Sequence, residues 1–273
     1  RKIHNMGYDC DLYQDIPPTK LRNMDEKFRR AHHYKFWGLI ADLFFYNMIE
    51  NRFFALKIKN LDNYYKRDNN FANIIYAPHT NWWDGIVGYN MCNRVLKTKL
   101  IMMIEELNRF PILAKVGAFP VNKKSAQSAM KALKYASLEL SQDKNKSLWI
   151  FPQGIIKPPN FRPIEFQTGL TYIAQKVVEK AGGVNLIPMC VHYTFLREDK
   201  PEVLVEVKDP YIIKDINEIK DRKWFTHKLA SDFEVALNEQ VAQIQAGHLN
   251  GYDFLFKQKL PWYKKLEKRL KRI

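Results

Sequence analysis

The stretch Asn73-Ile74-Ile75-Tyr76-Ala77-Pro78-His79-Thr80-Asn81-Trp82-Trp83-Asp84 decides the fold class of this chain. Four of its first five residues are apolar and predict a strand, which Pro78 ends. His79 then lies on the loop that leaves the strand, and Asp84 is positioned to cap a following helix. A histidine on a loop at the edge of a sheet stands where α/β enzymes carry out chemistry.

The stretch Phe151-Pro152-Gln153-Gly154 ends a second predicted strand, which begins at Ser147, and its proline and glycine predict a tight turn. Because loops that leave the strands of one α/β sheet meet at the same edge, we expect His79 to lie near this turn. One loop then holds a base and the other shapes a pocket. That pairing favours acyl transfer to a hydroxyl group.

The spacing of His79 and Asp84 carries little information by itself. Four of the seven histidines precede an aspartate by five positions, namely His4/Asp9, His79/Asp84, His227/Asp232 and His248/Asp253. The first of these lies in a polar stretch, and the last two lie in or near a predicted helix. Only His79 follows an apolar strand and opens a helix, so we predict it as the reactive histidine.

The rest of the chain alternates strands and helices. Strands are predicted near residues 73–77, 100–104, 118–121, 147–151, 184–191 and 203–207. Helices are predicted near residues 84–96, 125–141, 168–181 and 215–245, the second of them capped by Ser125. This alternation predicts an α/β fold with a mixed central sheet flanked by helices.

The composition bounds the functional class. The chain has 273 residues, enough for one large domain, and a net charge of +15, so its surface prefers polyanions. No recognised nucleic-acid-binding motif accompanies the charge, so we expect no nucleic-acid partner. Cys10, Cys92 and Cys190 are far apart and form no Cys-x-x-Cys pair. We therefore expect a reducing compartment and no metal site.

Residues 1–60 are predicted as an N-terminal arm, up to about residue 24, followed by an apolar helical segment. Between Asp25 and Lys59, apolar residues recur at the spacing of one long helix or two short ones. They are Phe36, Leu39, Ile40, Leu43, Phe44, Met48, Phe53 and Phe54. This segment either packs on a core or associates with a membrane interface. No apolar run reaches the roughly 18 to 20 residues that span a bilayer.

Residues 261–273 predict a basic amphipathic helix with Pro261 at its start. Its apolar residues stand at helical spacing between lysines and arginines, at Tyr263, Leu266, Leu270 and Ile273. An anionic membrane surface is a natural partner for such a helix. A solvated helix docked on the domain is the alternative.

Four blocks stand in the order and at the separations of a known family. They are Pro78-His79-Thr80-Asn81-Trp82-Trp83-Asp84, Gly117-Ala118-Phe119-Pro120-Val121-Asn122-Lys123, Phe151-Pro152-Gln153-Gly154 and Ile187-Pro188-Met189-Cys190-Val191. With them, the chain resembles the glycerolipid acyltransferases, which include the lysophosphatidic acid and glycerol-3-phosphate acyltransferases and the glycolipid acyltransferases related to them. The resemblance covers about residues 73–192 and implies an acyltransferase domain over residues 61–273.

The resemblance implies catalytic roles for two residues of the first block. His79 is the general base that takes the proton of the acceptor hydroxyl, and Asp84 fixes its tautomer and stabilises the imidazolium. The acyl donor is a thioester of acyl-carrier protein or coenzyme A, attacked directly, with no cofactor bound. The sequence agrees, because no serine or cysteine stands in a nucleophile-elbow pattern.

Other residues of the first and third blocks, together with lysines at or just after the second and third blocks, are expected to bind substrate. They are Asn81, Trp82, Trp83, Lys123, Lys124, Phe151, Pro152, Gln153, Gly154 and Lys157. The third block departs from the family pattern, which has glutamate where Gln153 stands and an arginine soon after. In this chain Ile155 and Ile156 follow, and the second block ends in lysine where the family has arginine.

These departures bear on the acceptor, because arginine binds phosphate through two hydrogen bonds and lysine acts as a point charge. The resemblance implies 1-acylglycerol-3-phosphate as the acceptor. A sugar hydroxyl of a glycolipid or glycosylated isoprenoid is the alternative, and a catalytically inactive lipid-binding relative is a second one. We expect the protein at the cytoplasmic face of a membrane, peripheral or monotopic, with an anionic lipid surface, a lipid acceptor and an acyl thioester as partners.

Overall fold

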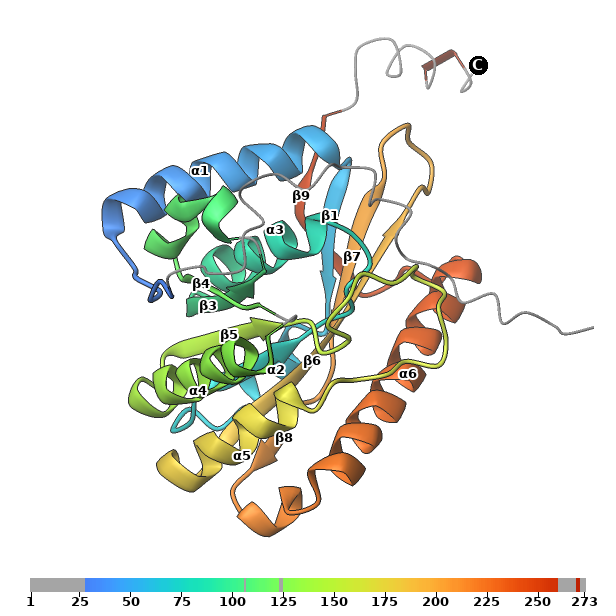
Figure 1. Cartoon of the computed structure of the whole chain (residues 1–273). Coiled ribbons are helices and arrows are strands. Elements are labelled where there is room, and N and C mark those ends of the chain that lie inside the picture. Colours follow the sequence, from blue (N-terminus) through green and yellow to red (C-terminus); the bar gives the residue numbers. More distant parts are fainter. Residues whose placement is uncertain (1–27, 106, 123–124, 260–268, 271–273) are drawn as a thin grey trace, which may run out of the picture.

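The computed structural model describes residues 28–105, 107–122, 125–259 and 269–270. Within them, nine strands form one mixed sheet with helices on both faces (Figure 1). The strand order is β4 (Ala118–Pro120), β3 (Lys99–Ile104), β5 (Lys146–Ile150), β2 (Asn73–Tyr76), β6 (Val184–Thr194), β7 (Glu202–Val207), β1 (Ala55–Lys59) and β9 (Tyr252–Lys257). The short β8 (Tyr211–Ile213) pairs with β6. The expected α/β fold with a mixed sheet is confirmed.

The long strand β6 joins a parallel part of the sheet to a mixed part. Its first half pairs in parallel with β2, up to Tyr76 opposite Pro188, and its second half pairs antiparallel with β7 from Met189 onward. All six predicted strands are present. Strands β1, β8 and β9 were not predicted, because β1 continues an apolar run that reads as helix and β8 has three residues.

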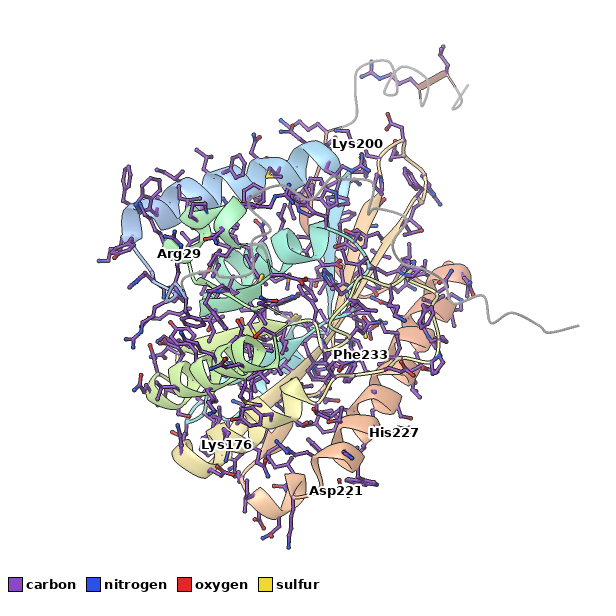
Figure 2. All side chains as sticks on the ribbon, viewed as in Figure 1. Arg29, Lys176, Lys200, Asp221, His227 and Phe233 are labelled. Carbon is purple, nitrogen blue, oxygen red and sulfur yellow. The ribbon has the colours of Figure 1, made fainter. Side chains whose placement is uncertain are left out.

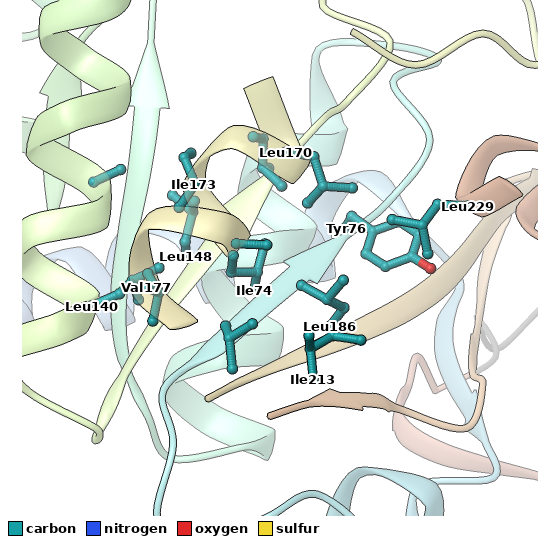
Figure 3. Close-up of a cluster of buried hydrophobic side chains, with 14 of the residues drawn as sticks. Ile74, Tyr76, Leu140, Leu148, Leu170, Ile173, Val177, Leu186, Ile213 and Leu229 are labelled. Atoms are coloured by element: carbon teal, nitrogen blue, oxygen red, sulfur yellow. The ribbon is translucent and has the colours of Figure 1, made fainter. Parts of the chain in front are cut away.

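Alternate residues of the central strands enter two separate cores. In β2, Ile74 and Tyr76 join the cluster covered by α4 (Ala126–Gln142), α5 (Gly169–Ala181) and α6 (Arg222–Gln245) (Figure 3). Ile75 and Ala77 join the opposite cluster with α3 (Trp83–Asn90). Since every residue of β2 is buried, the strand is fixed from both faces.

The helices of both layers follow the sequence expectations. Helix α3 continues into a π-helical turn, η2 (Met91–Val95), and α4 is capped as predicted by Ser125, whose hydroxyl oxygen accepts the backbone N–H of Ser128 at 3.2 Å. The shorter elements are α2 (Asp62–Tyr65), η3 (Leu107–Arg109), η4 (Pro111–Lys115) and η5 (Ile216–Ile219). The last of these precedes α6, so the helix predicted from residue 215 is two helices.

The expected helical segment up to Lys59 is shorter than predicted. Helix α1 (Lys35–Arg52) ends before Phe53, and residues Ala55–Lys59 form β1 between β7 and β9. The helix boundary was missed because apolar residues continue across it. In the described residues, no helix is long and apolar enough to cross a membrane.

Helix α1 presents large apolar side chains to solvent. Those more than half exposed are Phe36, Leu39, Leu43 and Phe44. Ile49, near the end of the helix, is fully buried instead, and Ala41, Phe45 and Met48 pack against the same core from the opposite face of the helix. The predicted N-terminal arm and most of the predicted helix over residues 261–273 lie outside the described residues.

Candidate active site

Strands β2 and β5 lie side by side in parallel, with Tyr76 opposite Ile150, so their following loops leave the same edge of the sheet. The loop after β2 leads to α3 on one face, and the loop after β5 leads to α5 on the other. Adjacent loops that diverge to opposite faces create the crevice where α/β proteins bind ligands. His79 and the Phe151–Gly154 turn stand at this position.

The imidazole of His79 is hydrogen-bonded to the carboxylate of Asp84. The distance from Nδ1 to Oδ2 is 3.1 Å, and the Asp84 side chain is 2% exposed whereas that of His79 is 22% exposed. A carboxylate can only accept here, so Nδ1 carries the proton and Nε2 is left as the acceptor. The pair therefore presents a proton-accepting nitrogen from a partly open site.

Asp84 is held by the loop that precedes it. Its Oδ2 also accepts the backbone N–H groups of Thr80 at 2.6 Å and Asn81 at 2.9 Å. The helix has its N-cap at Trp82 and starts at Trp83, so Asp84 lies in the first turn and the predicted capping role is wrong. The carboxylate instead reaches back to organise the loop that carries His79.

Tyr193 completes the contacts of the carboxylate. Its hydroxyl donates to Asp84 Oδ1 at 2.7 Å. Burial, followed by the charge of Asp84, raises the pKa of Tyr193 well above its usual value, so the hydroxyl keeps its proton. Sequence reasoning missed this residue. The available signal is the alternation along β6, which places Tyr193 on the same face as Met189 and Val191.

The Phe151–Gly154 turn holds the backbone of His79. The N–H of His79 donates to Gln153 Oε1 at 2.9 Å, and the N–H of Lys157 donates to the carbonyl of His79 at 2.8 Å. The Phe151 ring stacks on the imidazole, with centroids 4.3 Å apart and planes inclined by 11°. Gly154 closes the turn with φ of 74°, a left-handed conformation that favours glycine.

The structure assigns other contacts to several residues predicted to bind substrate. The Oδ1 of Asn81 accepts the N–H of Trp83 at 2.7 Å, and the Trp83 ring packs edge-on against Phe53 with centroids 5.2 Å apart. Pro152 is buried, and its carbonyl accepts the N–H of Gln167 at 2.7 Å. These three therefore build the loops around the site.

The other predicted binding residues are Trp82, Lys157, Lys123 and Lys124. Trp82 is 59% exposed beside the His79 loop and can contact a ligand. The Lys157 ammonium group lies 3.8 Å from the centroid of the Phe161 ring. Lys123 and Lys124 lie outside the described residues.

Within the part of the chain that the structure describes, neither His227 and Asp232 nor His248 and Asp253 form a pair like that of His79 and Asp84, while His4 and Asp9 lie outside it. His227 and Asp232 both lie on α6, where His227 is exposed (Figure 2). Asp232 instead bonds to Lys228 at 2.5 Å and to the hydroxyl of Tyr211 at 2.8 Å. Among the described residues, no group of three or more histidine, cysteine, aspartate and glutamate side chains could hold a metal ion.

Comparison with known proteins identifies the family. The model of the acyltransferase family matches residues 56–192, just over half of the 273 residues. Among solved structures, the chain is similar to the 1-acyl-sn-glycerophosphate (LPA) acyltransferase PlsC from Thermotoga maritima, with 13% identity and a TM-score of 0.45 over 71% of this chain and 79% of that one. No curated protein matches significantly. The matched segment contains both loops of the crevice, and the chain belongs to the acyltransferase family.

Proposed function

We propose that this acyltransferase moves a fatty acyl chain from an acyl thioester to a lipid hydroxyl, with His79 as the general base and Asp84 as its partner. The observation that supports this most directly is the 3.1 Å contact between His79 Nδ1 and Asp84 Oδ2 at the ends of β2 and β5. That contact leaves Nε2 as the ring nitrogen that can accept the proton of the acceptor hydroxyl.

The proposed reaction uses these groups and the two substrates. His79 Nε2 takes the proton of the acceptor hydroxyl while the oxygen attacks the thioester carbonyl. The tetrahedral intermediate then expels the thiolate, which receives the proton from the imidazolium. Asp84, buried and hydrogen-bonded to Nδ1, stabilises the imidazolium between these two transfers.

The exposed face of α1 supports association with a membrane surface. Leu39 and Leu43 are each 71% exposed, and Phe36 is 65% exposed one turn earlier. Large apolar groups on one helix can enter the interface of a bilayer, where their burial contributes about 25 cal/mol per Å². The net charge of +15 adds attraction to anionic lipid. We infer a peripheral protein that meets its lipid acceptor at this surface.

We propose 1-acylglycerol-3-phosphate as the first acceptor to test, with a sugar hydroxyl of a glycolipid as the alternative. The alternative is favoured because Ile155 and Ile156 follow the turn where the family pattern has arginine. Both are 46% exposed, and neither side chain can bind a phosphate as arginine does. The Oε1 of Gln153 accepts the backbone N–H of His79, so this predicted binding residue also fixes the position of the histidine.

The proposed function is tested with the full chain, acyl-coenzyme A, and vesicles that contain either 1-acylglycerol-3-phosphate or a diacylglycerol glycoside. Mass spectrometry of the lipids identifies the acylated product, and thiol release gives the rate. His79→Ala is expected to abolish product, while His227→Ala, a matched histidine with aspartate five residues later, retains it. Equal product from the His79→Ala variant and the unaltered chain would exclude the proposed base. Product from neither acceptor would exclude both acceptor proposals.

A further inference from the structure

The carboxylate of Asp84 has donors on both oxygens, and they come from different parts of the chain. Oδ2 faces His79, Thr80 and Asn81 within the loop after β2. On Oδ1 the short contact is the Tyr193 hydroxyl at 2.7 Å, whereas the hydroxyl of Thr80 lies at 3.4 Å. Tyr193 is therefore the principal donor to Oδ1 among the described residues, and it reaches Asp84 from 109 positions along the chain.

The ring of Tyr193 is also held in place by contacts outside the loop. Tyr193 lies near the end of β6, paired with Val203 of β7. Its ring packs against Phe53 at a centroid distance of 5.7 Å, and Phe53 is 2% exposed. A donor on a sheet strand, packed on a buried aromatic ring, is a rigid reference point for Asp84.

The hydrogen bond from Tyr193 fixes the orientation of the Asp84 carboxylate. Rotation about the bond between Cβ and Cγ of an aspartate is soft, so donors to one oxygen alone leave the carboxylate plane weakly fixed. A short hydrogen bond from Tyr193 to Oδ1 fixes that plane and keeps Oδ2 toward His79 Nδ1. The orientation of the imidazole then depends on strand β6 as well as on its own loop.

We propose that Tyr193 is a positioning residue for acyl transfer, acting through Asp84 on His79 without contacting substrate. This inference rests on the proposed role of His79 as the base. It goes beyond that role in assigning the orientation of the catalytic pair to a residue outside the four sequence blocks. The expected signature is a loss of turnover with unchanged substrate binding.

Tyr193→Phe is the informative variant, because it keeps the ring that packs on Phe53 and removes only the hydroxyl. A matched control is Tyr211→Phe, which loses a hydroxyl that donates to Asp232 at 2.8 Å, outside the crevice. With acyl-coenzyme A and vesicles of either acceptor, kcat of Tyr193→Phe should fall about tenfold, as for the loss of a charge-assisted hydrogen bond, while KM changes by less than about twofold.

A spectroscopic readout separates positioning from a merely structural role. The Nδ1 proton of His79 should give a downfield NMR resonance in the unaltered chain, and Tyr193→Phe should move it upfield as the carboxylate turns away. Tyr211→Phe should leave both kcat and this resonance unchanged. A Tyr193→Phe protein with unaltered kcat and an unaltered resonance overturns the proposal.

Two further outcomes are also decisive. If the unaltered chain acylates neither acceptor, the proposed function fails, and the His79 resonance alone then decides whether Tyr193 positions the pair. If Tyr193→Phe does not fold, the unaltered protein is measured instead. Its Tyr193 hydroxyl proton should then exchange slowly with water and show a through-space coupling to Asp84. A rapidly exchanging hydroxyl proton overturns the proposal.

Discussion

The backbone N–H of His79 donates to the side-chain carbonyl of Gln153 at 2.9 Å, which joins two loops that are 74 positions apart in the chain. The carbonyl of His79 accepts the N–H of Lys157, so both backbone groups of the histidine are held by the segment after β5. The loop after β5 therefore contributes to the site by fixing where His79 stands. Gln153 is therefore predicted to hold His79 in position.

Replacing Gln153 by leucine should lower both stability and turnover. The variant leaves the partly buried N–H of His79 without its acceptor, which costs about 1–3 kcal/mol. Gln153→Glu keeps an acceptor oxygen and should retain turnover within about threefold, which corresponds to less than 1 kcal/mol. Chemical denaturation and the acyl-transfer rate check both variants. Equal stability and rate for Gln153→Leu and the unaltered chain would show that the contact is unimportant.

A charge placed on the outward face of α1 should weaken membrane binding. Leu43→Asp places a carboxylate at a position where the leucine side chain is 71% exposed, so the fold should be unaffected. Insertion of this face into a bilayer should become unfavourable. Asn47→Asp introduces the same charge one turn later at an exposed polar position and is the matched control. Flotation with anionic vesicles should show a loss for Leu43→Asp that clearly exceeds the loss for Asn47→Asp. Equal losses would mean that charge alone governs binding.

Gly88 allows α3 to approach the sheet closely. A Cβ at this position would lie 2.7 Å from the Trp149 ring, which is itself 1% exposed and unable to move aside. Gly88→Ala should therefore destabilise the protein by about 1–3 kcal/mol despite the better helix propensity of alanine. Gly85→Ala, whose Cβ would lie 3.9 Å from its nearest neighbour, is the control in the same helix and should be neutral or stabilising. Thermal unfolding compares the two, and a neutral Gly88→Ala would contradict the close approach.

Stability should fall in mildly acidic solution, partly because of His192. Burial lowers the pKa of His192 from its usual value, so below pH 6.5 the unfolded chain binds more protons than the folded one. The stability present above pH 6.5 is lost as the pH falls through the lowered pKa. The change in unfolding free energy between pH 7.5 and pH 5.5 should be smaller in His192→Gln than in the unaltered chain. The exposed His227→Gln is the control, and identical pH dependence in all three proteins would refute the prediction.

The sequence predicted those parts of the fold and site that depend on local patterns. Buried strands such as β2 appear as short apolar runs, and Pro78 marks the loop that carries His79. The contact between His79 and Asp84 was anticipated because both residues stand in one loop and the following helical turn. Their catalytic roles remain predictions.

The remaining features depend on contacts between distant segments. The start of β1 could not be separated from α1, because Phe53 and Phe54 continue the apolar pattern across the boundary. The bond from Tyr193 to Asp84 and the bond from His79 to Gln153 each join loops or strands that only the folded sheet brings together. Side-chain contacts of this kind leave no periodic signal in the sequence.

The measurement that tests the central claim most directly is the initial rate of acyl transfer by folded His79→Ala, relative to the unaltered chain, at saturating thioester. Loss of a general base should lower kcat by about 10²–10⁴-fold. Added imidazole, which can enter the space left by the side chain, should restore part of the rate. A rate within threefold of that of the unaltered chain, insensitive to imidazole, would contradict the assignment of His79 as the base.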